Sequence, residues 1–210
     1  MLRRSLVFIR RINFLLGYTR ATIWHLRRFS QNWRRGEPIR VVDFATGSAD
    51  VPQAICRWAE RAGWDVRVVG LDLHAETARL AATESAGRIR IVRGDALNPP
   101  FADGAFDYAV CNMFLHHLPD DAVTTVLRQM NRVARRGVIV GDLLRHRRAY
   151  AWIKLLTLAS NPMVKHDAAV SVAQAFRREE IIALRDAAGM SYAAYRRHFG
   201  HRFSLAGEKG

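Results

Sequence analysis

Three aspartates in the first half of the chain could bind a ligand, because each one follows a short apolar run. Asp43, Asp72 and Asp95 end runs of the kind that form buried strands. The carboxyl ends of parallel strands share one edge of a sheet, so we expect the three carboxylates to face one crevice. Asp72 also lies 22 residues after Asp50. In dinucleotide folds a carboxylate at roughly 20 residues binds ribose hydroxyls, and the alternative here is a strand-end turn.

A loop of small residues follows Asp43. Residues 45–49 are Ala-Thr-Gly-Ser-Ala, after which Asp50 is expected to cap a helix with Pro52 in its first turn. A strand, a tight loop and a helix start in succession are typical of a nucleotide-type cofactor site, where backbone N–H groups point at the ligand. The loop lacks the pattern G-x-G-x-x-G and has only Gly47. Two alanine Cβ atoms disfavour a pyrophosphate, so we expect a cofactor without phosphate.

Two adjacent histidines are the candidates for acid–base chemistry. His116 and His117 directly follow a predicted strand over 106–111 and could deprotonate a phenol, enol or amine. Each could instead pack against the helix that follows. His166 with Asp167 forms a weaker second candidate pair.

The elements that position these residues alternate from residue 39 onward. Short apolar runs are followed by segments of helical periodicity, which indicates right-handed crossovers and a parallel sheet covered by helices on both faces. The fold class is therefore α/β, and the last two strands are close enough to form a hairpin. Predicted strands cover 39–44, 66–71, 88–92, 106–111, 137–142, 190–197 and 199–206, and predicted helices cover 51–62, 75–86, 120–134 and 178–188.

Two flanking segments complete the predicted organisation. Residues 1–36 contain nine arginines and no acidic residue, with apolar residues at helical spacing. They indicate two basic amphipathic helices hinged near Gly17, which we interpret as a lid; a cleaved transit peptide and a membrane-surface helix are the alternatives. Residues 37–210 would then form the main domain. An apolar insertion at about 143–177 is expected to cap the substrate.

The net charge of +14 is carried almost entirely by arginine, since the chain has only three lysines. Such a charge favours an anionic partner: nucleic acid, an acidic membrane face or an acidic substrate. Two cysteines cannot build a disulfide framework or a metal cluster, which fits a reducing cytoplasm. No apolar run reaches membrane-spanning length, so membrane contact would be peripheral.

Taken in order, the motifs resemble those of the class I S-adenosylmethionine-dependent methyltransferases. They are similar in particular to the small-molecule branch near the ubiquinone and menaquinone methyltransferases. The resemblance covers about 39–142 and implies the strand order 3-2-1-4-5-7-6 with strand seven antiparallel. Its residues are Val42–Asp50, Val69-Gly70-Leu71-Asp72, Gly94-Asp95-Ala96, and Phe106–Asn112 with Leu115-His116-His117-Leu118.

The resemblance also implies a role for each matching position in binding S-adenosyl-L-methionine. The first motif would hold the methionine part, and the later ones the ribose, the adenine and the region of the sulfonium. The positions are Asp43, Ala45, Thr46, Gly47 and Asp50 for methionine, Asp72 for the ribose, Leu73, Asp95 and Ala96 for adenine, and Asn112 near the sulfonium. Ala45 and Ala49 depart from the family, which usually has glycine there.

The function we expect is methyl transfer to oxygen or carbon of a small aromatic, quinone-like or polyketide acceptor, with a lipophilic acceptor favoured by the apolar cap. An RNA methyltransferase is the alternative suggested by the charge. Against it, Asn112-Met113-Phe114-Leu115 stands where an Asn/Asp-Pro-Pro-aromatic tetrapeptide would be expected, and no RNA-binding module is visible. A non-catalytic methyltransferase-like protein, attached to a membrane or partner through its N-terminal helices, is the third interpretation.

Overall fold

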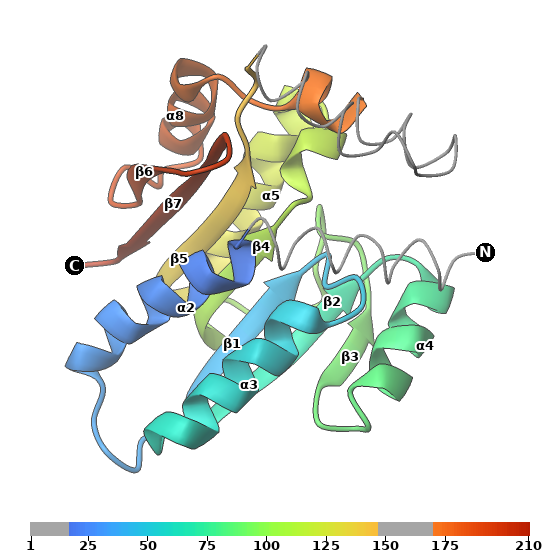
Figure 1. The fold of residues 1–210 in the computed structure, drawn as a ribbon, viewed down its shortest axis with the longest axis vertical. Helices are drawn as coiled ribbons and strands as arrows, with labels where there is room; N and C mark the ends of the chain where they lie inside the picture. The colour runs from blue at the N-terminus through green and yellow to red at the C-terminus, as the bar shows by residue number, and fades with distance from the viewer. Residues whose placement is uncertain (1–16, 147–169) are drawn as a thin grey trace.

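A single mixed sheet organises the part of the chain that the computed structural model describes, residues 17–146 and 170–210. Its strand order is β3-β2-β1-β4-β5-β7-β6, with β7 antiparallel to both neighbours (Figure 1). This is the expected order, and the α/β fold class is confirmed. The strands are β1 (Ile39–Phe44), β2 (Val66–Asp72), β3 (Arg90–Arg93), β4 (Phe106–Asn112), β5 (Ala134–Leu143), β6 (Ala194–His198) and β7 (Arg202–Glu208).

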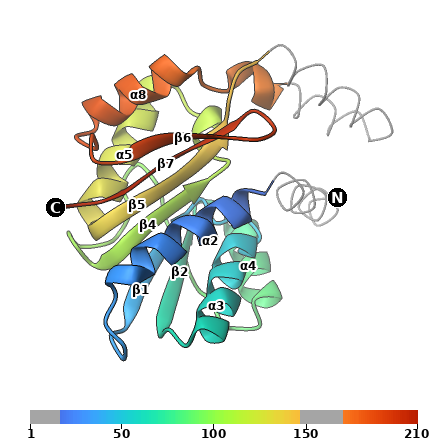
Figure 2. The ribbon, with the colours of Figure 1, turned by 60° about the vertical axis from the view of Figure 1, so that its left-hand side comes forward.

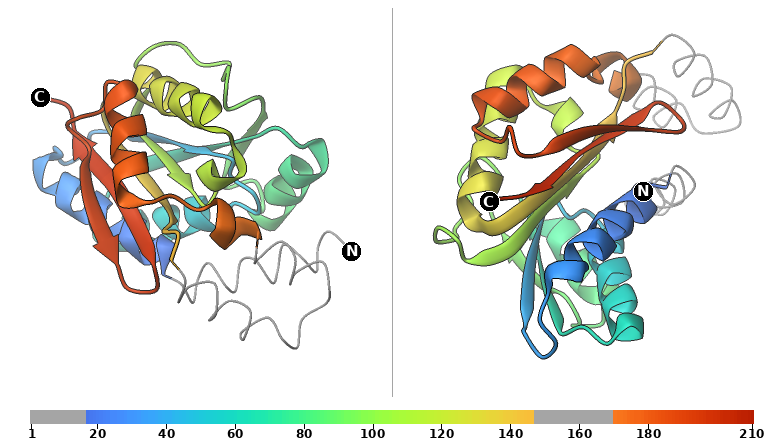
Figure 3. Two further views of the ribbon diagram at one scale, coloured as in Figure 1. Left: turned by 90° about the horizontal axis from the view of Figure 1, so that it is seen from above. Right: turned by 90° about the vertical axis from the view of Figure 1, so that its left-hand side faces the viewer.

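Helices cover both faces of the sheet (Figure 2). In that view α2, α3 and α4 lie on one face and α5 and α8 on the other, and the right-hand panel of Figure 3 shows the sheet between the two layers. Their bounds are α2 (Tyr18–Phe29), α3 (Asp50–Ala62), α4 (Ala75–Glu84), α5 (Asp120–Val133) and α8 (Arg178–Ala187), with short 3-10 turns η1 (Ser30–Asn32) and η2 (Leu115–His117).

The two faces follow from the alternation of side chains along each strand. In β1, Val41 packs with Ile55 of α3, whereas its neighbour Val42 packs in the cluster that includes Leu127 of α5. All four side chains are fully buried. Burial of this kind stabilises the fold by about 1.5–3 kcal/mol per large aliphatic side chain.

Helix α2 is the second of the two predicted N-terminal helices, and it begins directly after Gly17, whose φ of 77° is left-handed. It packs into the main core: Leu26 and Phe29 are buried with residues of β1, α3 and β4. Just beyond it, Trp33 Nε1 donates a hydrogen bond of 2.8 Å to Tyr108 Oη on β4. Residues 1–16, where the first helix was predicted, lie outside the described residues.

Some predicted boundaries were wrong. The final hairpin was expected over 190–197 and 199–206, but its strands start at Ala194 and Arg202. Residues 190–193 form a turn instead, closed by a hydrogen bond from Ala193 N to Met190 O of 2.9 Å. Strand β5 starts three residues earlier than predicted, at Ala134, and β3 starts two residues later than predicted.

The predicted cap, 143–177, falls mainly on residues 147–169, which lie outside the described residues. Its two ends are described, and they meet beside the carboxyl end of β5. Leu144 forms an isolated parallel bridge with Phe176, and Arg145 N donates to Phe176 O at 2.9 Å. Among the described residues, no helix is long and apolar enough to cross a membrane.

Candidate functional site

Asp43 and Asp72 lie at neighbouring strand ends, as the sequence predicted. In the parallel register of β1 and β2, Asp43 is opposite Gly70, so the Asp72 backbone lies two positions further along the adjacent strand. Both aspartates are buried, exposing 3% and 7% of their surfaces. The third aspartate, Asp95, is exposed in the loop after β3.

Asp43 carries a buried carboxyl with little to stabilise its charge. Its pKa is raised to about 8: burial is the main cause, a hydrogen bond from Thr46 opposes the shift, and the nearby carboxylates of Asp50 and Asp72 add to it. That bond joins Thr46 Oγ1 to Asp43 Oδ2 at 2.8 Å. Among the described residues no cation pairs with Asp43. A buried carboxyl in this state is suited to receive a cationic group, which would restore its ionised form.

Asp72 holds the backbone of the loop between β1 and α3. Its Oδ2 accepts a hydrogen bond from Gly47 N, and its Oδ1 accepts one from His74 N, both at 3.0 Å. Two hydrogen bonds of this type fix the orientation of the carboxylate. The loop and the end of β2 are thus connected through the side chain that the sequence singled out.

The loop itself has an unusual backbone. Ala45, Gly47 and Ala49 all have left-handed φ values, of 52°, 55° and 56°. Alanine pays roughly 1–2 kcal/mol in this conformation, which explains why glycine is usual there. The prediction that Asp50 caps α3 was wrong: the capping position is the left-handed Ala49, and Asp50 is the first helical residue.

Gly70 leaves the room in which Thr46 sits. A Cβ at Gly70 would lie 2.8 Å from Thr46 Cγ2 and 2.9 Å from Thr46 Oγ1, so any larger residue would displace the threonine. Thr46 N also donates to Leu71 O at 2.9 Å. The glycine in the Val69–Asp72 motif therefore positions the hydroxyl that bonds Asp43.

Two exposed leucines flank this region. Leu73, after β2, exposes 53% of its surface, and Leu97, after β3, exposes 36%. Between them in sequence, Asp95 Oδ1 accepts a hydrogen bond from Leu97 N at 2.9 Å, and Ala96 is buried. Exposed apolar side chains on neighbouring loops are suited to the faces of a flat apolar ring. Leu97 was missed, although its position two residues after Asp95 resembles that of Leu73 after Asp72.

Asn112 ends β4 beside the neighbouring strand. Its Oδ1 accepts a hydrogen bond of 3.3 Å from Thr22 on α2, and its Nδ2 is buried without a partner among the described residues. A Cβ at Gly141 of β5 would lie 2.5 Å from Asn112 Oδ1, so the glycine allows the amide to lie across β5. Asn112 thus joins the sheet edge to the N-terminal helix.

Tyr18 is the largest side chain near Asn112 and Gly141 that the sequence analysis did not predict. Its ring lies beside Gly141, and its hydroxyl is buried without a partner among the described residues. Burial, and then the charge of Asp142, raise its pKa, whereas the nearby Arg202 lowers it, so the phenol stays neutral. The signal was present: Tyr18, Thr22, His25 and Phe29 share one helical face and are buried.

The two histidines occupy different environments. His116 is buried, and its Nδ1 lies 2.6 Å from Oδ1 of Asp142 on β5. His117 is exposed, with its ring centroid 4.0 Å from that of His116. Asp142 was missed, although it ends an apolar strand in the same way as Asp43. The base role predicted for either histidine stays a prediction.

Comparison with known proteins agrees with this geometry. Residues 41–137 match the family model described as "Methyltransferase domain". This segment holds the loop, Asp43, Asp72 and both histidines. The predicted resemblance is confirmed: residues 41–137 match a methyltransferase domain, and the strand order is the one that a class I, Rossmann-like methyltransferase fold implies.

Curated relatives place it near quinone methyltransferases. A demethylmenaquinone methyltransferase of Staphylococcus epidermidis is 29% identical over 133 residues, which are 62% of this chain and 52% of the relative. A 2-phytyl-1,4-naphtoquinone methyltransferase of Synechococcus elongatus is 32% identical, covering 65% of this chain and 58% of the relative. The chain thus spans little more than half the length of these relatives.

A solved structure extends the likeness to nearly the whole chain. A SAM-dependent methyltransferase from Aquifex aeolicus superposes with a TM-score of 0.60, covering 94% of this chain and 96% of that one. At 14% sequence identity, this likeness concerns the fold alone.

Proposed function

We propose that the protein transfers a methyl group from S-adenosyl-L-methionine to oxygen or carbon of a small, lipophilic, quinone-like aromatic acceptor. The observation that carries the proposal is the arrangement of Asp43 and Asp72 on either side of the Thr46–Gly47 loop. The names of the curated relatives, which are quinone methyltransferases, support the acceptor class.

The residues present fit this cofactor. The uncompensated Asp43 carboxyl would receive the cationic methionine part, and Asp72 would exchange its bond to the loop for bonds to ribose hydroxyls. Leu73 and Leu97 would enclose the adenine, with Ala96 beside them. When bound, the cofactor supplies a methyl group on a positively charged sulfur. The acceptor would bond to that methyl group with its own electron pair, and the pair of the carbon–sulfur bond would remain on sulfur.

The contribution of the protein is mainly alignment, since a well-oriented reaction gains several kcal/mol from proximity alone. Asn112 and Tyr18 would lie next to the acceptor, where their unpartnered Nδ2 and Oη atoms can donate to an acceptor oxygen. Because Asp142 holds Nδ1 of His116, a proton leaving the acceptor would be taken at Nε2 of that ring. His117 is the alternative base.

The test has two parts. Calorimetry with S-adenosylhomocysteine should show binding by the full chain and a loss of affinity in Asp72→Ala. Labelled-methyl transfer should then be measured with a demethylated naphthoquinone, a catechol and a short RNA as acceptors. Transfer to RNA alone would contradict the proposed acceptor, and absence of cofactor binding would favour a non-catalytic protein.

A further inference from the structure

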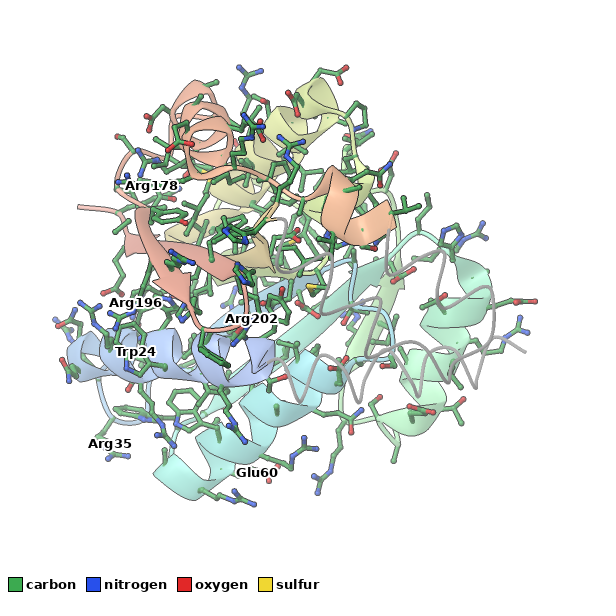
Figure 4. All side chains as sticks on the ribbon, turned by 45° about the horizontal axis from the view of Figure 1, so that its top comes forward. Trp24, Arg35, Glu60, Arg178, Arg196 and Arg202 are labelled. Atoms are coloured by element: carbon green, nitrogen blue, oxygen red, sulfur yellow. The ribbon has the colours of Figure 1, made fainter. Side chains whose placement is uncertain are left out.

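Helix α2 and the β6–β7 hairpin lie side by side and form one surface, which we call the helix–hairpin face (residues 18–29 and 194–208). The two parts are joined at Ser204, whose Oγ lies 2.8 Å from both His25 Nε2 and His198 Nε2. A second link is the guanidinium of Arg196, which lies 4.4 Å from the ring centroid of Trp24. Figure 4 shows Trp24 on α2 with Arg196 of the hairpin next to it.

The helix–hairpin face is strongly basic. Residues 18–29 contain no acidic residue, and the acidic residue in 194–208, Glu208, lies at the end of β7 away from the turn, where it accepts hydrogen bonds from Asn32 and Tyr108. Its exposed arginines belong to α2 and strand β6. They are Arg20, Arg27, Arg28 and Arg196. Arg202 is buried over the Tyr18 ring, and Arg197, opposite Phe203, points to the other side of the hairpin.

Two aromatic side chains stand out from this basic surface. Phe199, at the turn of the hairpin, exposes 96% of its surface. Trp24 is partly exposed and has a guanidinium on each side, with Arg28 at 5.0 Å and Arg196 at 4.4 Å from its ring centroid. The Phe199 ring buries almost no surface within the fold. Exposed aromatic rings beside cations are typical of surfaces that bind at the membrane–water interface.

The turn of the hairpin lies at the same edge of the sheet as the candidate site. Arg202, at the start of β7, pairs with Leu143, at the end of β5. In addition, Leu144 N donates to His201 O at 2.8 Å. Phe199 therefore lies at the same edge of the sheet as Asp43 of β1 and Asn112 of β4.

We propose that the helix–hairpin face docks on an anionic phospholipid surface. Phe199 inserts at the boundary between headgroups and acyl chains, and the arginines lie at the headgroup phosphates. With Phe199 as its one fully exposed ring among the described residues, the face favours a bilayer over RNA, because single-stranded nucleic acid is bound by several stacked aromatics along a groove. Docking does not depend on the proposed function, but it would bring the acceptor edge close to a bilayer that dissolves lipophilic acceptors.

The experiment is flotation of the full chain with vesicles of phosphatidylcholine, with and without phosphatidylglycerol. We expect binding only to the anionic vesicles. Phe199→Ser should weaken partitioning by about tenfold or more, because a buried phenylalanine is lost. Arg196→Glu should weaken it by more than the roughly fivefold expected from loss of one basic charge near the surface.

The matched control is Arg90→Glu, an exposed arginine on β3 at the opposite edge of the sheet, which changes the net charge equally. It should bind vesicles nearly as the wild type does. Residues 1–16 stay constant in all variants, and circular dichroism should confirm that each variant is folded.

Equal vesicle binding by Phe199→Ser, Arg196→Glu and the wild type would overturn the proposal. The proposal would also be overturned if Phe199→Ser and Arg196→Glu kept vesicle binding but lost affinity for a short single-stranded RNA. Binding of S-adenosylhomocysteine by the same samples separates the two proposals. Loss of vesicle binding with normal cofactor binding concerns the helix–hairpin face, and absent cofactor binding concerns the proposed function.

Discussion

Two halves of the sheet differ in charge and in how they are built. What we call the cofactor half comprises β1, β2, β3 and the loops after them. The carboxylates that we propose to bind the cofactor, Asp43 and Asp72, belong to it and lie within the matched segment 41–137. What we call the acceptor half, where we propose that the acceptor binds, comprises α2, β5, β6 and β7 and includes the helix–hairpin face. The cofactor half is assembled from consecutive strand ends, whereas the acceptor half joins segments from both ends of the chain.

This difference matters for stability as well as for binding. In the cofactor half, polar groups are held mostly by nearby backbone: Asp72 bonds Gly47 and His74. In the acceptor half, the central carboxylate, Asp142, bonds a buried histidine from another element. We therefore expect changes in the acceptor half to affect folding first, and changes in the cofactor half to affect binding first.

The largest effect is expected for Asp142→Ala. The carboxylate accepts from His116 Nδ1, from His116 N and from Leu143 N, at 2.6, 3.3 and 2.7 Å, so its loss leaves three buried donors unpaired. Unfolding in urea should show a loss of about 3–5 kcal/mol. Asp142→Asn should recover part of the lost stability.

The control lies in the cofactor half. Asp95→Ala removes an exposed carboxylate with one backbone hydrogen bond and should lower the free energy of unfolding by less than about 1 kcal/mol. Equal losses of stability in Asp142→Ala and Asp95→Ala would contradict this difference between the two halves.

The next effect is on cofactor affinity. Asp72→Ala should weaken S-adenosylhomocysteine binding about 10- to 100-fold, since hydrogen bonds to a charged group contribute about 1.5–3 kcal/mol. Calorimetry measures the change. Asp65→Ala, which removes an exposed carboxylate just before the same strand, is the control and should leave affinity unchanged. If both variants bind equally well, Asp72 has no part in the cofactor site.

The pH dependence should identify Asp43. Its pKa in the folded, ligand-free protein is about 8, against 3.8 for an ordinary aspartate. A cationic ligand favours the ionised carboxylate, so binding below pH 8 should release a proton. Affinity should then rise by up to about tenfold per pH unit and level off near pH 8. Calorimetry in buffers of different ionisation enthalpy measures the proton, and Asp43→Asn should abolish its release.

The same residue affects stability with the opposite trend. Because the folded pKa is raised, the stabilising contribution of the protonated carboxyl is complete below about pH 4 and is lost as the pH rises through 8. Asp43→Asn should remove this component of the stability profile. An unchanged profile in the variant would mean that Asp43 does not hold a proton in the folded protein.

The smallest effect concerns the strained loop. Ala49→Gly should raise the free energy of unfolding by less than about 1 kcal/mol, because relief of the left-handed conformation is partly offset by the entropy of glycine in the unfolded chain. Ala54→Gly, the same change inside α3, should lower it by about 1 kcal/mol. Thermal unfolding compares the two. A loss in Ala49→Gly as large as in Ala54→Gly would show that the loop holds no strain.

The sequence predicted the cofactor half well because its signals are local. Each aspartate lies within two residues of the end of its strand, so the position of Asp43 or Asp72 on the sheet edge follows from a few adjacent residues. The strand order came from the resemblance rather than from any local pattern. The capping role of Asp50 was predicted wrongly, since the left-handed conformation of Ala49 is not visible in a residue that usually avoids it.

The acceptor half could not be predicted in the same way, because its contacts join distant segments. Tyr18 lies beside Gly141, and Arg202 lies over the Tyr18 ring at 5.0 Å from its centroid. Periodicity identifies a buried face, but it does not say which partner covers that face. The exposure of Phe199 could not be predicted either, because nothing in the sequence distinguishes an exposed phenylalanine from a buried one.

The contact between α2 and β7 has a consequence for how the chain folds. His25 bonds Ser204, 179 residues later, and Asn32 bonds Glu208, 176 residues later. During synthesis α2 emerges early, but the partners on β7 that complete its packing emerge only after every other strand. Contacts of such long sequence separation slow folding. We therefore expect β7 to complete folding in one late, cooperative step, and an N-terminal fragment that lacks β7 to expose the unpaired edge of β5 and aggregate.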